Sequence, residues 1–261
     1  MCTQALPRRS PIVKSLVLIL SSFVIASLRP PLRGSIRFAI LAVWLCSALH
    51  SSFAAQPNVL LLMSDDLAAT LGCYGHPQAK TPNLDALAKR GVVFNKAYCQ
   101  FPHCNPSRSS MMTGMRPNTT RVTNNEDNLY TNHPGVLTMP HHFRENGYAT
   151  ARCGKIFHLG VPSGLESMDD PQGWDFGTPF KSELPFPPDR KSLVNVKRGK
   201  KEGLGWQEIP GDDELLVDGV FAKTAIEWLG KREKEKPFFL AVGFHRPHLP
   251  LVAPAKYFDL Y

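Results

Sequence analysis

The most informative part of the sequence reads Cys104-Asn105-Pro106-Ser107-Arg108, followed by Ser109-Ser110-Met111-Met112-Thr113-Gly114. Pro106 suits the first position of a helix, because its missing N–H needs no partner there. We therefore expect Cys104 to lie just before a helix whose free N–H groups and positive dipole end can hold a tetrahedral anion. Arg108 is expected to fold back toward the cysteine from about one turn further on. The Cys104 thiol is predicted to be acidified and reactive, the alternative being a merely buried cysteine beside a proline-capped helix.

Two carboxylates follow an apolar run upstream of this motif. The run extends from Asn58 to Met63 and continues through Ser64 into Asp65 and Asp66. A continuous apolar run predicts a strand buried on both faces of a largely parallel sheet, and ligands collect beyond the carboxyl ends of such strands. Carboxylate oxygens suit Ca²⁺ or Mg²⁺ better than zinc. The alternative is a solvated turn, in which aspartate is common.

Further segments predict alternating helices and strands. The start and stop signals of Thr81–Gly91 predict a helix, and Gly91–Tyr98 is expected to form a strand. Other expected elements are a helix around Met139–Asn146, a strand from Tyr148, a helix within Glu214–Leu229 that packs on the sheet, a buried strand over Pro237–Phe244, and an irregular insertion between Gly160 and Asp212. The predicted fold class is therefore α/β, with a largely parallel sheet flanked by helices.

Two more groups of polar residues stand at the ends of predicted strands. Lys155 and His158 follow the strand that begins at Tyr148, and they cannot share one face of a regular strand, because side chains alternate. The chain must therefore leave strand geometry near Lys155 if both are to reach one site. His245-Arg246-Pro247-His248 follows the strand over Pro237–Phe244, again at a carboxyl end. Solvated loop residues are the alternative for both histidines.

The pattern Cys-x-Pro-Ser-Arg, followed by an apolar pair and Thr-Gly, resembles the signature of the sulfatase family, whose cysteine is oxidised to formylglycine. Gly154-Lys155-Ile156-Phe157-His158 and Arg246-Pro247-His248 resemble the iduronate 2-sulfatase branch, and the second match points to His248 rather than His245. The resemblance implies an alkaline-phosphatase/sulfatase-like fold. It implies Cys104, Arg108, Lys155, His158 and His248 as catalytic residues, and Asp65, Asp66 and Cys104 as metal ligands.

The resemblance also implies an activity and its partners. These are hydrolysis of a sulfate ester of a sugar, one Ca²⁺ per site, and a maturation enzyme that converts Cys104 to formylglycine. Two alternatives stay open. One is a phosphoryl-transfer hydrolase of the same superfamily that keeps Cys104 as a thiol, and the other is a non-catalytic module that binds sulfated glycans.

Residues 1–55 have the composition of a leader. They hold no acidic residue and six of the 30 basic ones, so the remainder carries 24 basic and 22 acidic side chains, a net charge of +2. This near-neutral balance removes the main support for nucleic-acid binding. Arg33 and Arg37, the apolar run Phe38–Cys46 and the small residues up to Ala55 follow the order of a secretory signal peptide. We expect a secreted or periplasmic protein that meets a membrane only through an uncleaved leader.

Residues 56–261 are expected to be the N-terminal part of a sulfatase catalytic domain whose C-terminal part is missing. The resemblance implies that a downstream half supplies another Asp/Asn or Asp/His metal pair and a further lysine, and no residues after His248 match them. The metal site is therefore expected to be short of ligands.

Overall fold

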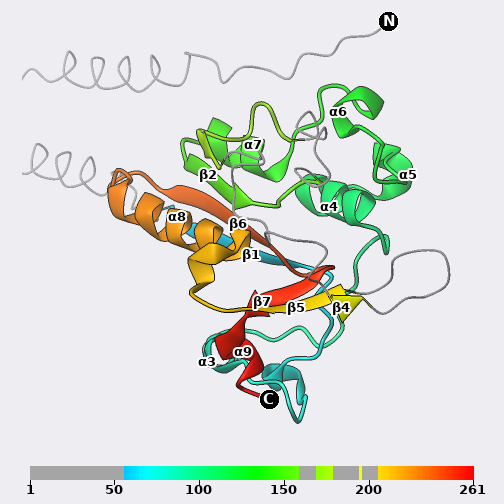
Figure 1. The fold of residues 1–261 in the computed structure, drawn as a ribbon. Helices are drawn as coiled ribbons and strands as arrows, with labels where there is room; N and C mark the ends of the chain where they lie inside the picture. The colour runs from blue at the N-terminus through cyan, green and yellow to red at the C-terminus, as the bar shows by residue number, and fades with distance from the viewer. Residues whose placement is uncertain (1–55, 159–168, 179–193, 196–204) are drawn as a thin grey trace, which may run out of the picture. The chain divides into compact units, whose positions relative to one another are not determined.

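A parallel sheet organises the chain around its central strand, β6. The computed structural model describes residues 56–158, 169–178, 194–195 and 205–261, so the predicted leader and much of the Gly160–Asp212 segment lie outside the described residues. The strand order is β1 (Val59–Asp65), β6 (Phe238–Pro247), β2 (Ala149–Gly154) and β3 (Phe176–Gly177). All three pairings are parallel (Figure 1), which confirms the predicted largely parallel α/β sheet.

The two faces of β6 are covered by different helices. Phe239 and Ala241 belong to one apolar cluster, which includes Met112 of α4 (Cys104–Thr113), and Phe143 of α7 (Met139–Glu145) packs against that cluster. Leu240 and Val242 face the opposite side, where they meet α8 (Val217–Lys231). The first six residues of β6 are buried. A strand buried on both faces, as predicted for Pro237–Phe244, is therefore confirmed at the centre of the sheet.

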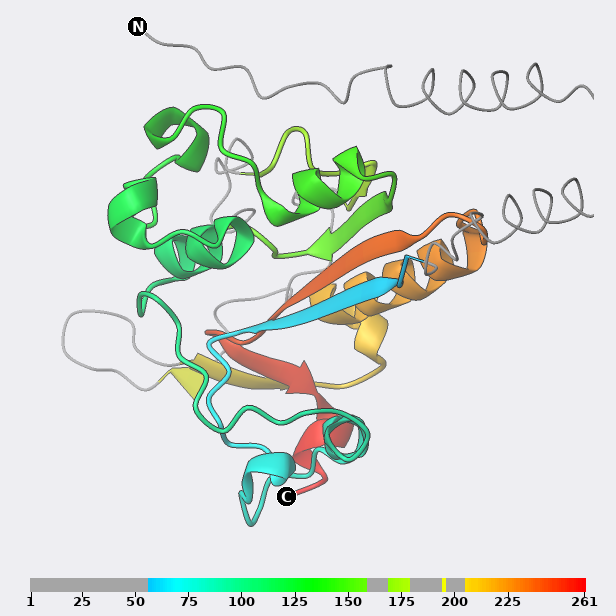
Figure 2. The same ribbon diagram turned by 180° about the vertical axis from the view of Figure 1, so that it is seen from behind.

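β1 differs from the prediction made for its apolar run. It lies at the edge of the sheet (Figure 2), and Leu60 and Leu62 are 50% and 51% exposed. Leu61 and Met63 pack against the same cluster as Phe239. Because side chains alternate along a strand, only one face of β1 is covered by the described residues. The expectation that this strand is buried on both faces is therefore wrong.

The predicted helices are largely confirmed, whereas one predicted strand is absent. Helix α3 (Pro82–Ala88) occupies the Thr81–Gly91 segment, and α7 begins at the predicted Met139. The helix expected within Glu214–Leu229 appears as the short 3₁₀ helix η4 (Asp213–Leu215) followed by α8, which packs on the sheet as predicted. Short elements fill the other connections: η1 (Gly72–Tyr74), α5 (Pro117–Thr120) and α6 (Leu129–Asn132).

The segment Gly91–Tyr98 forms no strand, which makes that prediction wrong. Val92, Phe94 and Tyr98 are 80%, 70% and 80% exposed. A strand needs a neighbour to pair with its backbone N–H and C=O groups. Within the described part of the chain no strand lies beside this segment, so its β-favouring composition is not expressed as a sheet.

A second, smaller sheet is built partly from residues predicted to be irregular. It consists of β4 (Val194–Asn195), β5 (Gly205–Ile209) and β7 (Leu251–Pro254), with β5 parallel to β7, and α9 (Ala255–Phe258) follows β7. The described parts of Gly160–Asp212 therefore contribute β3 to the main sheet and two strands to the second sheet. Among the described helices, none is both long enough and apolar enough to cross a bilayer.

Candidate active site

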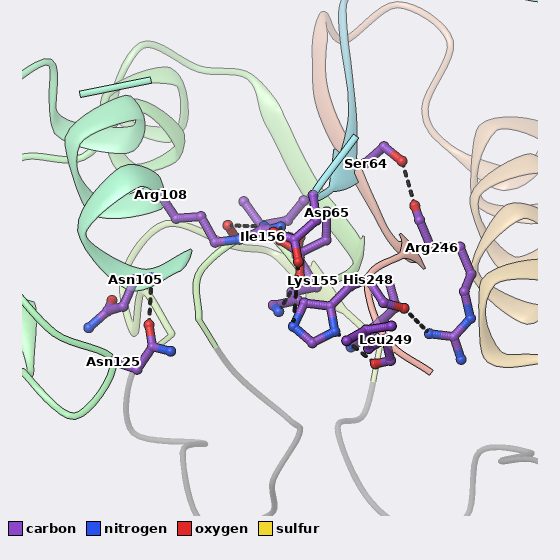
Figure 3. A network of polar contacts seen from close by, with 12 residues as sticks. Ser64, Asp65, Asn105, Arg108, Asn125, Lys155, Ile156, Arg246, His248 and Leu249 are labelled. Carbon is purple, nitrogen blue, oxygen red and sulfur yellow. Dashed lines mark hydrogen bonds and ion pairs between the residues drawn. The ribbon is translucent and has the colours of Figure 1, made fainter. Parts of the chain in front are cut away.

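A pocket of about 710 Å³ opens where β1 ends and α4 begins. Five of the residues singled out in the sequence line it: Asp65, Asp66, Cys104, Arg108 and His248. They come from three segments that are distant in the chain. The segments meet because β1 and β6 run in parallel and deliver their carboxyl ends to one edge of the sheet. Lys155 and His158 are buried beside this group rather than in the pocket wall. Figure 3 shows Asp65, Arg108, Lys155 and His248 gathered at this point.

Cys104 is itself the first residue of α4. His103 is the N-cap, with extended backbone, and its carbonyl accepts the N–H of Ser107 at 3.1 Å. Pro106 is therefore the third helical residue, two places later than predicted. It is tolerated there because N–H groups of the first turn have no partner within the helix. The nucleophile candidate is thus held by regular helix geometry at the pocket wall.

Asp65 lies at the centre of a buried charged group. Its Oδ1 accepts from the Arg108 guanidinium at 2.6 Å, and its Oδ2 accepts from Lys155 Nζ. Arg108 also donates to the carbonyl oxygens of Lys155 at 2.6 Å and Ile156 at 2.9 Å. Burial alone would raise the pKa of the Asp65 carboxyl, but the two cations outweigh it and hold that pKa at about 2. Asp65 is therefore ionised at neutral pH.

Two glycines allow Lys155 to reach Asp65. β2 ends at Gly154, whose φ of +80° favours glycine, and the N–H of Lys155 donates to the Gly243 carbonyl at 2.9 Å. A Cβ atom on Gly154 would lie 2.2 Å from that carbonyl oxygen, and one on Gly243 would lie 1.9 Å from the Lys155 oxygen. The prediction that the chain leaves strand geometry near Lys155 is confirmed.

The protonation of Cys104 differs from the prediction. Burial is the largest influence and raises the pKa of the Cys104 thiol, and the carboxylates of Asp65 and Asp66 raise it too. The positive charges of Lys155 and Arg108 lower it but do not compensate, and both cations already donate hydrogen bonds to other groups. The expectation of an acidified thiol is therefore wrong, and an unmodified Cys104 is a neutral thiol at pH 7.

His158 is also held neutral. Its side chain is buried, and burial together with the nearby cations Lys155 and Arg108 lowers its pKa to about 4. The buried Nδ1 atom of His158 has no hydrogen-bond partner among the described residues. At neutral pH the ring can therefore offer one N–H donor and one acceptor nitrogen to a group beside it.

Potential metal ligands converge on the pocket. One ligand atom from each of Asp65, Cys104 and His248 lies within 4.8 Å of the others. Asp66 is exposed, with a left-handed φ of 59°, and its carboxylate lies 3.8 Å from His248 Nε2. The oxygens of Asp65 and Asp66 fit a hard divalent cation in kind, and a carboxylate can accept more than the bonds that Asp65 makes here. However, the described residues of the pocket provide fewer ligand oxygens than the about six to eight that Ca²⁺ binds.

His248 is held in the pocket wall by the residues before it. Arg246 donates from its guanidinium to the His248 carbonyl at 2.9 Å. The backbone N–H groups of His245 and Arg246 donate to the Asp218 carboxylate of α8 at 2.8 and 2.9 Å. The His245 ring instead stacks on Phe221 of α8, with ring centroids 6.2 Å apart. Of the two histidines, therefore, His248 lines the pocket and His245 packs against the helix.

Removing the Asp218 carboxylate should loosen this segment. Asp218→Ala leaves two backbone N–H groups without acceptors, so we expect the free energy of unfolding to fall by about 1–3 kcal/mol. Asp213→Ala is the control, because the Asp213 carboxylate is 44% exposed and meets the exposed side chains of Lys256 and Tyr257, but accepts from no backbone N–H among the described residues. A loss of less than about 1 kcal/mol is expected for it. Urea denaturation of both variants checks this, and equal stability of the two would contradict the proposed support of the His248 segment.

The pocket also contains residues that the sequence patterns did not single out. His103, Cys99 and Asn125 line it together with Cys104. His103 adjoins the cysteine and could have been found by proximity. No local signal marks Asn125, which lies in a loop after α5 and reaches the pocket only through tertiary contacts.

Comparison with known proteins places this geometry in a family. The Sulfatase family model matches residues 57–261. The chain is 34% identical to mouse iduronate 2-sulfatase over 248 residues, which cover 89% of this chain and 43% of the relative. It is 35% identical to human iduronate 2-sulfatase over 243 residues, with 88% and 43% covered. The phosphonate monoester hydrolase of Agrobacterium radiobacter shares the fold, with a TM-score of 0.60 and 24% identity over 79% of this chain and 44% of that one.

The fold is thus the alkaline-phosphatase-like α/β fold, with a largely parallel sheet flanked by helices. The chain belongs to the sulfatase family. It spans less than half the length of the mouse and human iduronate 2-sulfatases that it matches.

Proposed function

We propose that this chain carries the nucleophile of a sulfuric ester hydrolase that removes sulfate from a sulfated sugar. The observation that supports this most is the single pocket that contains Cys104 at the start of α4 beside the Asp65 carboxylate, with Arg108 in its wall and Lys155 behind it. A sulfate ester is a tetrahedral anion, and this pocket offers buried positive charge and the positive dipole end of α4 to it.

Residue 104 is proposed to act as formylglycine. Its formation is a two-electron oxidation of the Cys104 side chain in which sulfur leaves, and it needs a maturation enzyme and an external oxidant. The neutral thiol fits this proposal, because a half-buried cysteine of raised pKa is a weak nucleophile in its unmodified form. The hydrated aldehyde supplies one hydroxyl for attack on sulfur and a second that permits release of sulfate.

The other residues are proposed to handle charge and protons. Arg108 and Lys155, fixed by Asp65, offset the charge that develops on the sulfate oxygens. His158, neutral at pH 7, can donate a hydrogen bond. His248 donates from Nδ1 to the Leu249 carbonyl at 2.8 Å, so in its protonated form it can donate from Nε2 to the leaving oxygen. Arg108 and Lys155 need no reorganisation during the reaction, because their buried partners already hold both side chains in place.

Asp65, Asp66 and residue 104 are proposed to hold one Ca²⁺. When bound, this cation would polarise the sulfate and favour the ionised form of the attacking hydroxyl. The similarity to iduronate 2-sulfatases supports a 2-sulfated uronic acid as the sugar. We further propose that residues 1–55 direct the protein to the cell exterior or the periplasm.

The modification and the activity can be tested separately. We expect mass spectrometry to find the peptide that contains residue 104 lighter than its cysteine form when the chain is produced with a formylglycine-generating enzyme. Such protein should release sulfate from a 2-sulfated uronic acid disaccharide, lose activity on chelation and regain it with Ca²⁺. An unmodified thiol with release of phosphate from phosphate esters would favour the phosphoryl-transfer alternative. Tight binding of the disaccharide without turnover would favour a binding module.

A further inference from the structure

We infer that Asn105 is a positioning residue that fixes Asn125 in the pocket wall, where the Asn125 amide donates hydrogen bonds to the anionic group of the substrate. This inference rests on the proposed function, because it assigns a substrate contact to the same pocket. Neither residue is among those predicted from the sequence to act in the site.

Asn105 ties α4 to the loop at residues 123–128. Its side chain is buried, with 3% exposure. The Nδ2 group donates to the carbonyl oxygens of Asn124 at 2.9 Å and Asp127 at 2.7 Å, and Oδ1 accepts from the Ser109 hydroxyl at 3.2 Å. A carboxamide supplies two donors and an acceptor from one planar group, so a shorter or apolar side chain leaves these two carbonyl oxygens without their donors.

The loop also has hydrogen bonds of its own. The Asp127 carboxylate accepts from the backbone N–H groups of Thr123 at 2.7 Å and Asn124 at 3.1 Å. The Asn124 side chain accepts from the N–H groups of Glu126 and Asp127 at 2.9 and 2.8 Å. These bonds fix the shape of the loop, whereas Asn105 fixes its place relative to α4.

Asn125 is the loop residue that reaches the pocket. Its Oδ1 accepts the backbone N–H of Asn105 at 3.1 Å (Figure 3), so its acceptor faces the start of α4. Because the partner is a donor, the Asn125 Nδ2 group must be the other end of the carboxamide. That group makes no hydrogen bond among the described residues, and Asn125 lines the same pocket as Cys104. It therefore offers two uncharged N–H donors beside the nucleophile, which suit the acceptor oxygens of a sulfate group.

Binding of inorganic sulfate to the full chain tests the inference without turnover. All variants keep Cys104 unmodified, so differences in maturation do not contribute. In ¹⁵N-labelled protein, sulfate should shift the side-chain amide resonances of Asn125. We expect Asn125→Ala and Asn105→Ala each to weaken sulfate binding by about tenfold, the effect of one hydrogen bond to a charged group. The double variant should bind no more weakly than Asn125→Ala, since Asn105 acts through Asn125.

Asn132→Ala is the matched control. Its Nδ2 also donates to a backbone carbonyl, that of Arg121 at 2.7 Å, but Asn132 does not line the pocket. Sulfate binding should therefore stay unchanged. If Asn105→Ala does not fold, Ser109→Ala removes only the hydroxyl that holds Asn105 Oδ1, and it should weaken binding in the same direction by about two- to threefold.

Three results would overturn the inference. The first is wild-type affinity for sulfate in Asn105→Ala, or in Ser109→Ala where Asn105→Ala does not fold. The second is that Asn105→Ala weakens sulfate binding equally in the presence and absence of the Asn125 side chain. The third is that the wild-type chain does not bind sulfate. A modified chain that releases no sulfate from its ester, although the unmodified chain binds sulfate with the expected pattern, contradicts the proposed function and leaves this inference standing.

Discussion

Replacing Cys104 with serine is expected to reduce steady-state sulfate release by at least about 10³-fold, the scale of effect seen when a covalent nucleophile is removed. Cys104 starts α4 in the wall of the pocket, and serine is close to it in size, so the fold should be retained. A serine hydroxyl can attack sulfur once. Its carbon bears no second hydroxyl, so the resulting sulfate ester cannot be expelled by elimination. Sulfate release and the mass of the intact protein after incubation with substrate measure both effects.

Cys99→Ser provides the control for this prediction. Cys99 is exposed and lines the same pocket, but it does not begin a helix and lies outside the Cys-x-Pro-Ser-Arg pattern. Its replacement should leave the rate within about twofold of wild type, as expected of an exposed position. Full turnover by Cys104→Ser would contradict the proposed formylglycine chemistry.

Asp65→Asn is expected to lower the free energy of unfolding by about 3–5 kcal/mol, because it leaves buried positive charges uncompensated. The side chains of Lys155 and Arg108 are only 3% and 6% exposed, and both bond to the Asp65 carboxylate. A loss of this size is a large part of the about 5–15 kcal/mol that stabilises a typical domain. Urea denaturation at neutral pH measures it, and loss of activity should accompany it.

Asp66→Asn is the matched control for Asp65→Asn. The Asp66 side chain is 58% exposed, so its replacement should change stability by no more than about 0.5 kcal/mol while weakening metal binding. In addition, Lys155→Met in the Asp65→Asn background should restore part of the lost stability, since it removes one of the unpaired charges. Equal stability of Asp65→Asn and wild type would show that the buried charged group is not a stabilising unit.

Most of the pocket could be predicted from sequence because its parts are local signals at strand ends and at a helix start. Three signals each place a polar residue at one edge of a parallel sheet: the apolar run before Asp65, the end of strand geometry before Lys155, and the buried strand before His248. Burial on both faces is predicted for β6 and β1 but is found only at β6, and the reason is simple. A continuous apolar run has the same appearance whether or not a neighbour covers its second face, and Leu60 and Leu62 on that face of β1 stay about half exposed.

The electrostatic state of the site could not be predicted in the same way. The motif around Cys104 shows the helix start and Arg108, which favour a thiolate, but it does not show burial or the prior pairing of both cations with Asp65. These effects come from contacts such as Lys155 with Asp65, which lie 90 residues apart in the chain. Their balance raises the pKa of the thiol instead of lowering it.

By itself, the sequence of this protein determined which residues stand at the ends of strands and at the start of α4, because helix and strand signals depend on neighbours a few residues apart. The tertiary structure decided which of those residues touch, which charges are neutralised, and that Asn125 reaches the pocket. These properties depend on the order of strands in the sheet and on hydrogen bonds between distant segments, and neither is encoded in a local pattern.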